Sequence, residues 1–306
     1  MLIALIQAIV SGLAVGGAYA LIALGFSITF TTTKTLNFAH GDFVSVGSFI
    51  GVSALWLLLG KPVNAPLSGV TISIWQQCAA AFFAVVVIGI LGVLLYVLAV
   101  RPFAGKPGMS WVMSTIGFGI ILTSLGLALW GPAQTVVPSP VGDEVIRIGG
   151  VGIRPQEILM FVVAVAVMVA IDWVMRGTMI GKAMRAVAHN QRVASLMGIN
   201  VTAVMVGAFF LSSALAGLSG FLIAPIAAAS LFVGVGIALK GFSAAIVGGL
   251  SNPRGCVVGG FALGVLESLV NLWQAQWREI VVFLLVILVL ALRPQGLLGV
   301  GMVEKV

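Results

Sequence analysis

The sequence predicts an all-α, polytopic membrane protein that forms a single domain over residues 1–306. Hydrophobic residues make up 61% of the chain, charged residues make up only 8%, and the mean hydropathy is +1.23. Soluble proteins carry about 25% charged residues, so this chain lacks the polar side chains that a water-exposed surface needs. We therefore expect a bundle of helices in a lipid bilayer, without a separate soluble domain.

The chain contains apolar stretches of about the length that a helix needs to cross a bilayer, which is ~20 residues. Proline, glycine or charged residues separate them. They cover residues 5–30, 38–59, 76–100, 110–130, 156–175, 201–223, 256–274 and 279–292. The bundle is therefore expected to contain about 8–9 transmembrane helices.

The ninth candidate, residues 225–250, is apolar but discontinuous. It begins at Pro225, contains several glycines and Lys240, and ends before a Ser-Asn-Pro turn. Non-helical backbone at membrane depth is tolerated where protein or a wet cavity satisfies its polar groups. Two alternatives remain open: the segment crosses as a broken helix, or it enters and leaves on the same side.

The formal net charge of +7 carries information about orientation. If the loop 176–198 is cytoplasmic and 225–250 crosses, ten of the fifteen basic residues lie inside and five outside. The inner set is Lys34, Arg101, Lys106, Arg176, Lys182, Arg185, Arg192, Arg254, Arg293 and Lys305, and the outer set is Lys61, Arg147, Arg154, Lys240 and Arg278. Because cytoplasmic loops are enriched in Lys and Arg, we expect the N-terminus outside and the C-terminus in the cytoplasm. The basic excess therefore does not indicate a nucleic-acid partner.

Two connections are long enough to be structured. In the loop 131–155, apolar residues alternate with glycine and polar residues, which predicts a small hairpin on the outer face. The loop 176–199 is basic and amphipathic, which predicts a short helix that lies along the membrane or docks into a partner. Its apolar side is expected to contain Met184, Val187, Val193, Leu196 and Met197.

No catalytic, nucleotide or metal motif is present in the sequence. The segment around Lys182 has three residues between its glycines and no Ser or Thr after the lysine, so it does not match a phosphate-binding loop. The chain has two cysteines and two histidines, without the spacing of a metal site. We expect this chain to bind no metal and no cofactor and to have no enzymatic activity.

Polar residues near or inside the predicted spans are candidates for a translocation path, because ionisable groups are costly in hydrocarbon. Asp42 lies one turn into the second span, after Asn37, His40 and Gly41, and Glu267 lies in the middle of a later span. Asn37 can cap a helix, and Gly41 permits a close approach of backbone or substrate. Glu267 has two alternative roles: a carboxyl group hydrogen-bonded to a neighbouring helix, or a group that lines a wet path.

Glycines at four-residue spacing indicate close helix packing, since small residues let helix backbones approach in lipid. The pairs are Gly12 with Gly16, Gly255 with Gly259, and Gly260 with Gly264. One ordinary ion pair is also expected, between Asp172 and Arg176 one helical turn later.

Three segments together resemble a known family. They are TLNFAHGDF at 35–43, the stretch 181–200 that begins GKAMRA and ends ASLMGIN, and RPQGLLG at 293–299. In these motifs, in length and in hydropathy, the whole chain is similar to the permease subunits of branched-chain amino-acid ABC importers, and most similar to the shorter of their two permease types. One local departure is the pair His189-Asn190, where such permeases often carry an acidic or amide residue first.

The resemblance implies a bacterial inner-membrane protein that works with separate partners. These would be a second homologous permease, two cytoplasmic ATPase subunits that hydrolyse ATP, and a periplasmic binding protein that delivers leucine, isoleucine or valine. Segment 181–198 would be the coupling helix that contacts an ATPase. Its implied coupling residues are Gly181, Met184, Arg185, Val187, Arg192, Leu196 and Gly198. Gly198 suits the position at which the chain leaves a helix.

Two other function classes are alternatives to this one. A proton- or sodium-coupled carrier would use Asp42 or Glu267 as its titrating group, and would transport without ATP. An intramembrane enzyme would need a nucleophile facing its base, and the sequence contains no such pair.

Overall fold

The computed structural model describes residues 1–299 except residues 68, 104–108, 143 and 149. The long helices are α1 Leu2–Thr33, α2 His40–Leu58, α3 Ile74–Leu95, α4 Ser110–Trp130, α5 Pro155–Gly177, α8 Val201–Ala227, α10 Pro253–Trp273 and α11 Arg278–Leu292. The shorter elements are η1 Tyr96–Val100, η2 Arg101–Phe103, β1 Ile146–Ile148, β2 Val151–Ile153, α6 Met179–His189, α7 Gln191–Leu196, α9 Val233–Gly248 and η3 Ala275–Trp277.

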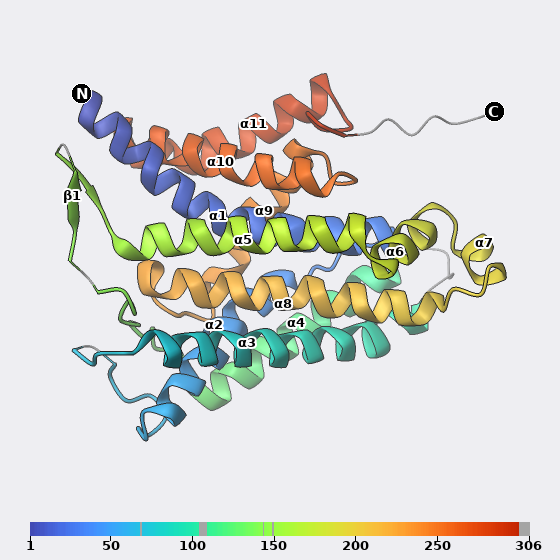
Figure 1. Ribbon diagram of the computed structural model, residues 1–306, viewed down its shortest axis with the longest axis horizontal. Coiled ribbons are helices and arrows are strands. Elements are labelled where there is room, and N and C mark those ends of the chain that lie inside the picture. The colour runs from blue at the N-terminus through green and yellow to red at the C-terminus, as the bar shows by residue number, and fades with distance from the viewer. Residues whose placement is uncertain (68, 104–108, 143, 149, 300–306) are drawn as a thin grey trace.

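The predicted class, an all-α polytopic membrane protein, is confirmed. In the part of the chain that the structure describes, eight helices are long and apolar enough to cross a membrane, and α9 is a shorter apolar helix. The helices run between two ends of an elongated bundle (Figure 1), with the β-hairpin and the start of α1 at one end and α6 and α7 at the other.

The segment 225–250 passes from one end of the bundle to the other. Just after α8, Ala229 forms a backbone bridge with Thr135, which lies at the hairpin end. Just after α9, Arg254 pairs with Asp172 near the opposite end of α5. The chain between Ala229 and Arg254 therefore connects the two ends of the bundle, as the crossing alternative requires.

The start predicted for this segment was wrong. Pro225 lies inside α8, two residues before that helix ends, and the break follows at Ala228, which has a φ of 61°. A proline commonly ends or kinks a helix, which is why the sequence suggested a break at Pro225, but α8 continues for two residues past it.

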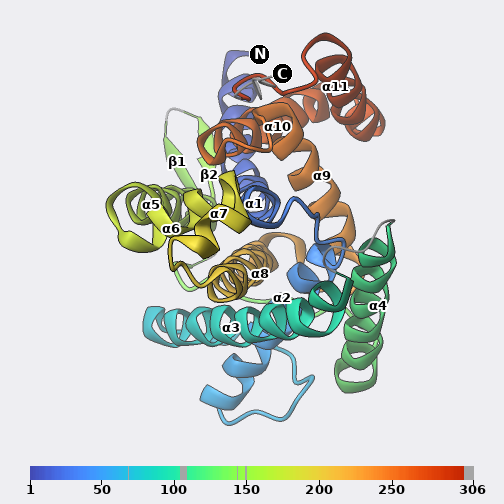
Figure 2. The same cartoon turned by 90° about the vertical axis from the view of Figure 1, so that its right-hand side faces the viewer.

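Helix α1 occupies the centre of the bundle, with α5, α8, α9 and α10 around it (Figure 2). Its close approach to α10 depends on the predicted glycine pairs. A Cβ atom on Gly16 would lie 2.9 Å from Phe261 Cα, and one on Gly264 would lie 2.5 Å from the Gly12 carbonyl oxygen. The two backbones therefore touch where both helices lack side chains.

The predicted hairpin in the loop 131–155 is confirmed. Strands β1 and β2 pair antiparallel, with Ile146 opposite Ile153. Two hydrogen bonds attach the hairpin to the first part of α1. The Gln7 side-chain oxygen accepts from the Gly152 N–H at 2.7 Å, and the Gln7 side-chain nitrogen donates to the Gly152 carbonyl oxygen.

Replacing Gly264 with alanine is expected to destabilise the protein, although alanine normally favours a helix over glycine by roughly 0.5–1 kcal/mol. The added methyl group would overlap the α1 backbone, and overpacking of this kind costs roughly 1–3 kcal/mol. The measurement is the thermal unfolding midpoint of the purified protein in detergent. Gly207→Ala, on the open side of α8 with nothing within 4 Å, is the matched control, and equal midpoints for the two variants would contradict the packing account.

Candidate functional site

The predicted path residues at the start of α2 face different helices. The expected capping of α2 by Asn37 was wrong, because the N-cap of this helix is Ala39 and no side chain caps it. The Asn37 Oδ1 atom instead accepts a hydrogen bond from the Ala39 N–H at 3.1 Å, within the turn before α2. The buried His40 ring packs against Phe26 of α1, with ring centroids 4.4 Å apart. A Cβ atom on Gly41 would lie 2.8 Å from Val235 Cα, so this glycine allows α2 to approach α9.

Asp42 faces α4 instead. The Thr123 hydroxyl donates to its Oδ1 atom at 2.7 Å, and Gly119 leaves room for the other carboxylate oxygen. The structure therefore does not bring His40 and Asp42 together, and Glu267 belongs to a separate cluster. Whether any of these groups lines a path stays a prediction.

Glu267 lies in a buried polar cluster between α1, α9 and α10. Its side chain is 8% exposed; Tyr19 of α1 donates a hydrogen bond to Oε2 at 2.7 Å, and the Lys240 ammonium of α9 lies 2.7 Å from Oε1. Glu267 thus makes the contacts expected of a carboxyl group that is hydrogen-bonded to neighbouring helices, which was the first of its two alternative roles.

Lys240, counted above with the outer basic residues, lies inside α9 and not in a loop. Its side chain is only 9% exposed and forms ion pairs with both Glu267 and Glu279, each at 2.7 Å. A lysine in an apolar segment is stable when carboxylates compensate its charge, and positive-side counting assumes that a lysine lies in a loop. Lys240 therefore links α9 to α10 and α11 through ion pairs. It is left out of the count of basic residues at the two ends of the bundle.

Residues at the start of α11 complete this cluster. The Arg278 Nε atom lies 3.2 Å from Glu267 Oε1, and its guanidinium also lies 3.5 Å from Glu279. Two cations and two carboxylates give a neutral set, with Arg278 and Glu279 half-exposed. Sequence reasoning missed Tyr19, Lys240, Arg278 and Glu279, although an isolated lysine within an apolar stretch was a usable signal.

The segment 176–199 forms two helices, so the single short helix expected there was wrong. Asn190 has extended backbone and separates α6 from α7. Its Oδ1 atom accepts from the N–H groups of Arg192 and Val193 at 3.0 and 3.1 Å, which caps α7. The apolar residues consequently do not share one side of a helix.

Four of the implied coupling residues fix α6 to the rest of the chain. Met184 and Val187 are buried, as is Gly181, whose Cα faces the backbone of Met175 at the end of α5. Arg185 donates a hydrogen bond to the Met175 carbonyl oxygen. These contacts hold α6 against α5.

Most side chains of helix α7 are exposed. Leu196 is 83% exposed and Met197 78%, and Arg192 is also exposed. The helix ends in a Schellman motif, in which Ile199 N–H donates to the Ala194 carbonyl and Gly198, with a φ of 83°, occupies the left-handed position. Of the implied coupling residues, Leu196 and Arg192 of α7 can therefore contact another protein, and α6 also exposes Met179, Ile180 and Lys182. Both helices lie at the same end of the bundle (Figure 1).

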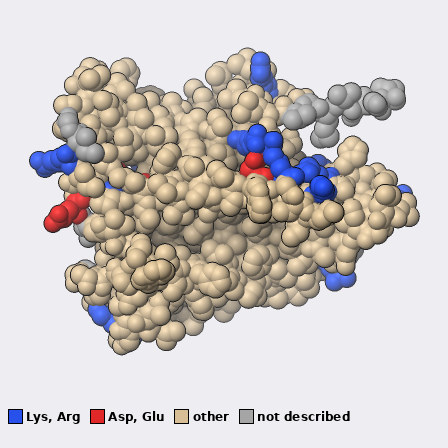
Figure 3. Space-filling view, in the orientation of Figure 1, with Lys and Arg blue, Asp and Glu red and all other residues tan. Residues whose placement is uncertain are grey.

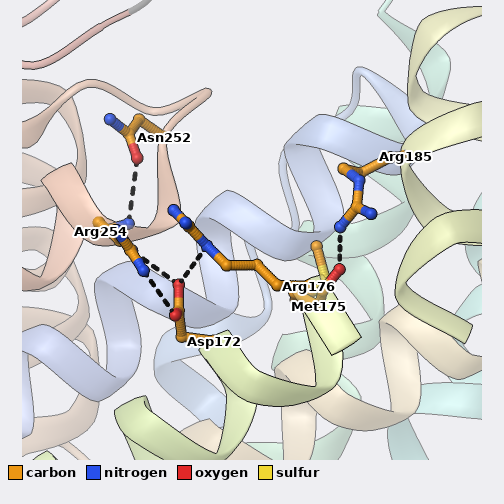
Figure 4. Close-up of polar contacts among 6 residues, drawn as sticks. All are labelled: Asp172, Met175, Arg176, Arg185, Asn252 and Arg254. Carbon is orange, nitrogen blue, oxygen red and sulfur yellow. Dashed lines mark hydrogen bonds and ion pairs between the residues drawn. The ribbon is translucent and has the colours of Figure 1, made fainter. Parts of the chain in front are cut away.

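The predicted ion pair between Asp172 and Arg176 is confirmed, with Nε 3.2 Å from Oδ1. Arg254 of α10 adds a bidentate contact to the same carboxylate, both distances being 2.7 Å (Figure 4). This cluster ties the end of α5 to the start of α10.

Over the described residues, no group of three or more His, Cys, Asp or Glu side chains is placed to hold a metal ion.

Replacing Lys240 with methionine is expected to cost roughly 3–5 kcal/mol of stability, because it leaves Glu267 buried without its closest cation. The double variant Lys240→Met/Glu267→Met removes one charge of each sign and should be more stable than the single variant. Thermal unfolding of the purified variants in detergent measures both. Arg176→Gln, which removes an exposed ion-pair partner, serves as the control with little expected effect. A double variant no more stable than Lys240→Met would show that uncompensated charge is not the cause.

Residues 8–290 match the family model described as "Branched-chain amino acid transport system / permease component". The chain is 31% identical to the high-affinity branched-chain amino acid transport system permease protein BraD of Pseudomonas aeruginosa, over 98% of each chain. It is 28% identical to the permease protein LivH of the same kind of system in Escherichia coli strain K12, over 98% of this chain and 97% of LivH.

A further relative is more distant in sequence. It is the probable branched-chain amino acid transport permease protein LivH of Methanocaldococcus jannaschii, 26% identical over 92% of this chain and 88% of that protein. The family match covers all the membrane-length helices from α1 to α11 apart from their outermost residues. The chain therefore belongs to the family of permease components of branched-chain amino acid transport systems.

Proposed function

We propose that this chain forms, with a second homologous permease, the membrane path of an ABC importer for branched-chain amino acids. The observation that carries the proposal is the family match over residues 8–290, with relatives of nearly the same length. The named relatives are permease proteins of high-affinity branched-chain amino acid transport systems. In the proposed assembly, a periplasmic binding protein supplies leucine, isoleucine or valine, and two ATPase subunits hydrolyse ATP.

The division of labour is consistent with the residues of this chain. Its sequence contains no phosphate-binding loop, so nucleotide would act from a partner. ATP binding can shift the permease between outward and inward forms only if the ATP-bound partner has different affinities for the two. The surface of the permease that contacts the ATPase must therefore be exposed and rigidly joined to the transmembrane helices.

The α6–α7 segment meets both requirements. Helix α6 is fixed by the buried Met184 and Val187 and by the contact of Arg185 with α5, while α7 exposes Leu196 and Arg192. We assign the direct ATPase contact to α7 and the transmission of its movement to α6. Gly181 and Gly198 would then preserve the geometry of the segment at its two ends.

The proposed orientation places this end of the bundle in the cytoplasm. Among the described basic residues, eight lie at the α6–α7 end and four at the hairpin end: Lys34, Arg101, Arg176, Lys182, Arg185, Arg192, Arg254 and Arg293, against Lys61, Arg147, Arg154 and Arg278. Lys106 and Lys305, which were also assigned to the inner side, lie outside the described residues. This asymmetry favours an outer N-terminus and a cytoplasmic C-terminus in a bacterial inner membrane.

The proposed function is tested by reconstitution into vesicles. The chain, its second permease and the two ATPases should take up radiolabelled leucine only when ATP and the binding protein are both supplied. Uptake by this chain alone, driven by an imposed proton or sodium gradient in ATP-free vesicles, would instead support a secondary carrier. The result separates the two classes directly because only one of them needs hydrolysis.

Leu196→Glu is expected to weaken ATPase binding and to reduce ATP-driven uptake by at least about tenfold, since a carboxylate buried in an apolar contact costs several kcal/mol. The measurements are co-purification of the ATPases with the permease pair and uptake in vesicles. Val136→Glu is the matched control, because Val136 is also exposed, at 63%, but follows α4 at the opposite end. Normal ATPase co-purification with Leu196→Glu would contradict the assignment of α7.

A further inference from the structure

A cavity of about 900 Å³ lies between α1, α5, α6 and α10 at the α6–α7 end of the bundle. It extends along the second half of α5 and the first half of α10, which touch each other at few points. We call it the α5–α10 groove. The fold leaves it outside the tightly packed seam between α1 and α10, so it is a separate feature from the glycine contacts.

The part of the groove within the bundle is apolar. Leu24, Met168, Ile171 and Val257 contribute to its wall. Val169 and Val258, also on the wall, are 64% and 54% exposed. Such a surface is suited to hydrocarbon chains, because burying it in water-free surroundings is favourable.

The end of the groove is basic. Lys34 follows α1, Arg176 ends α5, Arg185 lies on α6 and Arg254 begins α10. Only one carboxylate, Asp172, lies on the wall among them, and it is already bonded to Arg254 and Arg176 (Figure 4). Figure 3 shows the result as a group of blue side chains around a small red area, set in a largely uncharged middle part of this face. Four cations against one anion leave a local excess of three positive charges.

We propose that the α5–α10 groove binds an anionic phospholipid, with the headgroup phosphate among these cations and an acyl chain along the apolar wall. Basic pockets between transmembrane helices on the cytoplasmic side are suited to anionic headgroups, and the groove combines such a pocket with an apolar wall. A soluble anion would use the basic end alone. An apolar protein surface would leave the excess positive charge without a counterion.

The arrangement of charge with depth matches a lipid molecule. The four cations lie at helix ends, where the headgroup region of the bilayer begins, and the apolar wall residues lie one or more turns further into the same helices. Trp173, 68% exposed near the end of α5, fits the aromatic belt of that boundary. Lipid at this position would also contact α6 and so support the helix that precedes α7.

The test compares lipids retained by the purified full-length protein. Native mass spectrometry in detergent, with phosphatidylglycerol or phosphatidylcholine of equal chain length added, is expected to show tighter binding of phosphatidylglycerol. The double variant Lys34→Gln/Arg176→Gln should weaken phosphatidylglycerol binding by roughly tenfold to thirtyfold, the effect of two basic groups near an anionic lipid. Lys182→Gln/Arg293→Gln removes two exposed cations at the same end but outside the groove, and should bind like the wild type.

A second variant tests the apolar wall without changing charge. Val258→Trp should fill part of the groove and lower phosphatidylglycerol retention, whereas Ile120→Trp, at an exposed position of α4, should not. Equal retention of the two lipids by the wild type, or equal loss in both double variants, would overturn the proposal. A third result would also overturn it. If the transporter purified with its partners lacks the lipid, and a Val258→Cys variant cross-links to another subunit, that subunit covers the groove.

Discussion

Contact between the backbones of α1 and α10 is the constraint on which the rest of the bundle depends. Lipid supplies no hydrophobic drive for helix association, so close van der Waals contact must hold the helices together. Gly264 lies against the backbone of Gly12 and Gly16, and Gly260 lies against Ala20. With α1 held this way, α5, α8 and α9 can pack around its remaining faces.

The buried cluster around Glu267 adds a second, directional contact between the helices. Contact between glycine-rich helix faces alone does not define the position of one helix along another, whereas an ion pair does. Lys240 and Tyr19 reach the same carboxylate from α9 and α1, and Arg278 reaches it from the start of α11. The cluster thereby fixes the axial position of α9, which is short and begins after a break in the chain.

Much of the fold could be predicted from local sequence, because span length, turn residues and strand alternation are local properties. The helices and the hairpin before α5 follow from them. The break at Asn190 could not be found in this way, since hydrophobic periodicity continues across it while the side chain caps the next helix. The position of Lys240 also required knowledge of its partners, which are 27 and 39 residues further along the chain.

The candidate path residues show the same limit. Polar groups in predicted spans are recognisable from sequence, but the direction in which each one points depends on packing. His40 faces α1 and Asp42 faces α4, so the two cannot line one path through the centre of this chain. Of the two, Asp42 is the less buried and lies against the face of α4 that carries Gly119 and Thr123.

In the proposed assembly with a second permease, this placement is compatible with a path between the two subunits. The centre of the chain is filled by α1 and its glycine contacts, and a channel there would have to separate helices that are in backbone contact. Movement at an interface between two permeases would leave those contacts intact, and α6 and α7 could follow the movement because they are joined to α5 and α8 at one end. A rigid bundle that moves against a partner needs its internal contacts to be strong, which the α1–α10 seam and the Glu267 cluster provide.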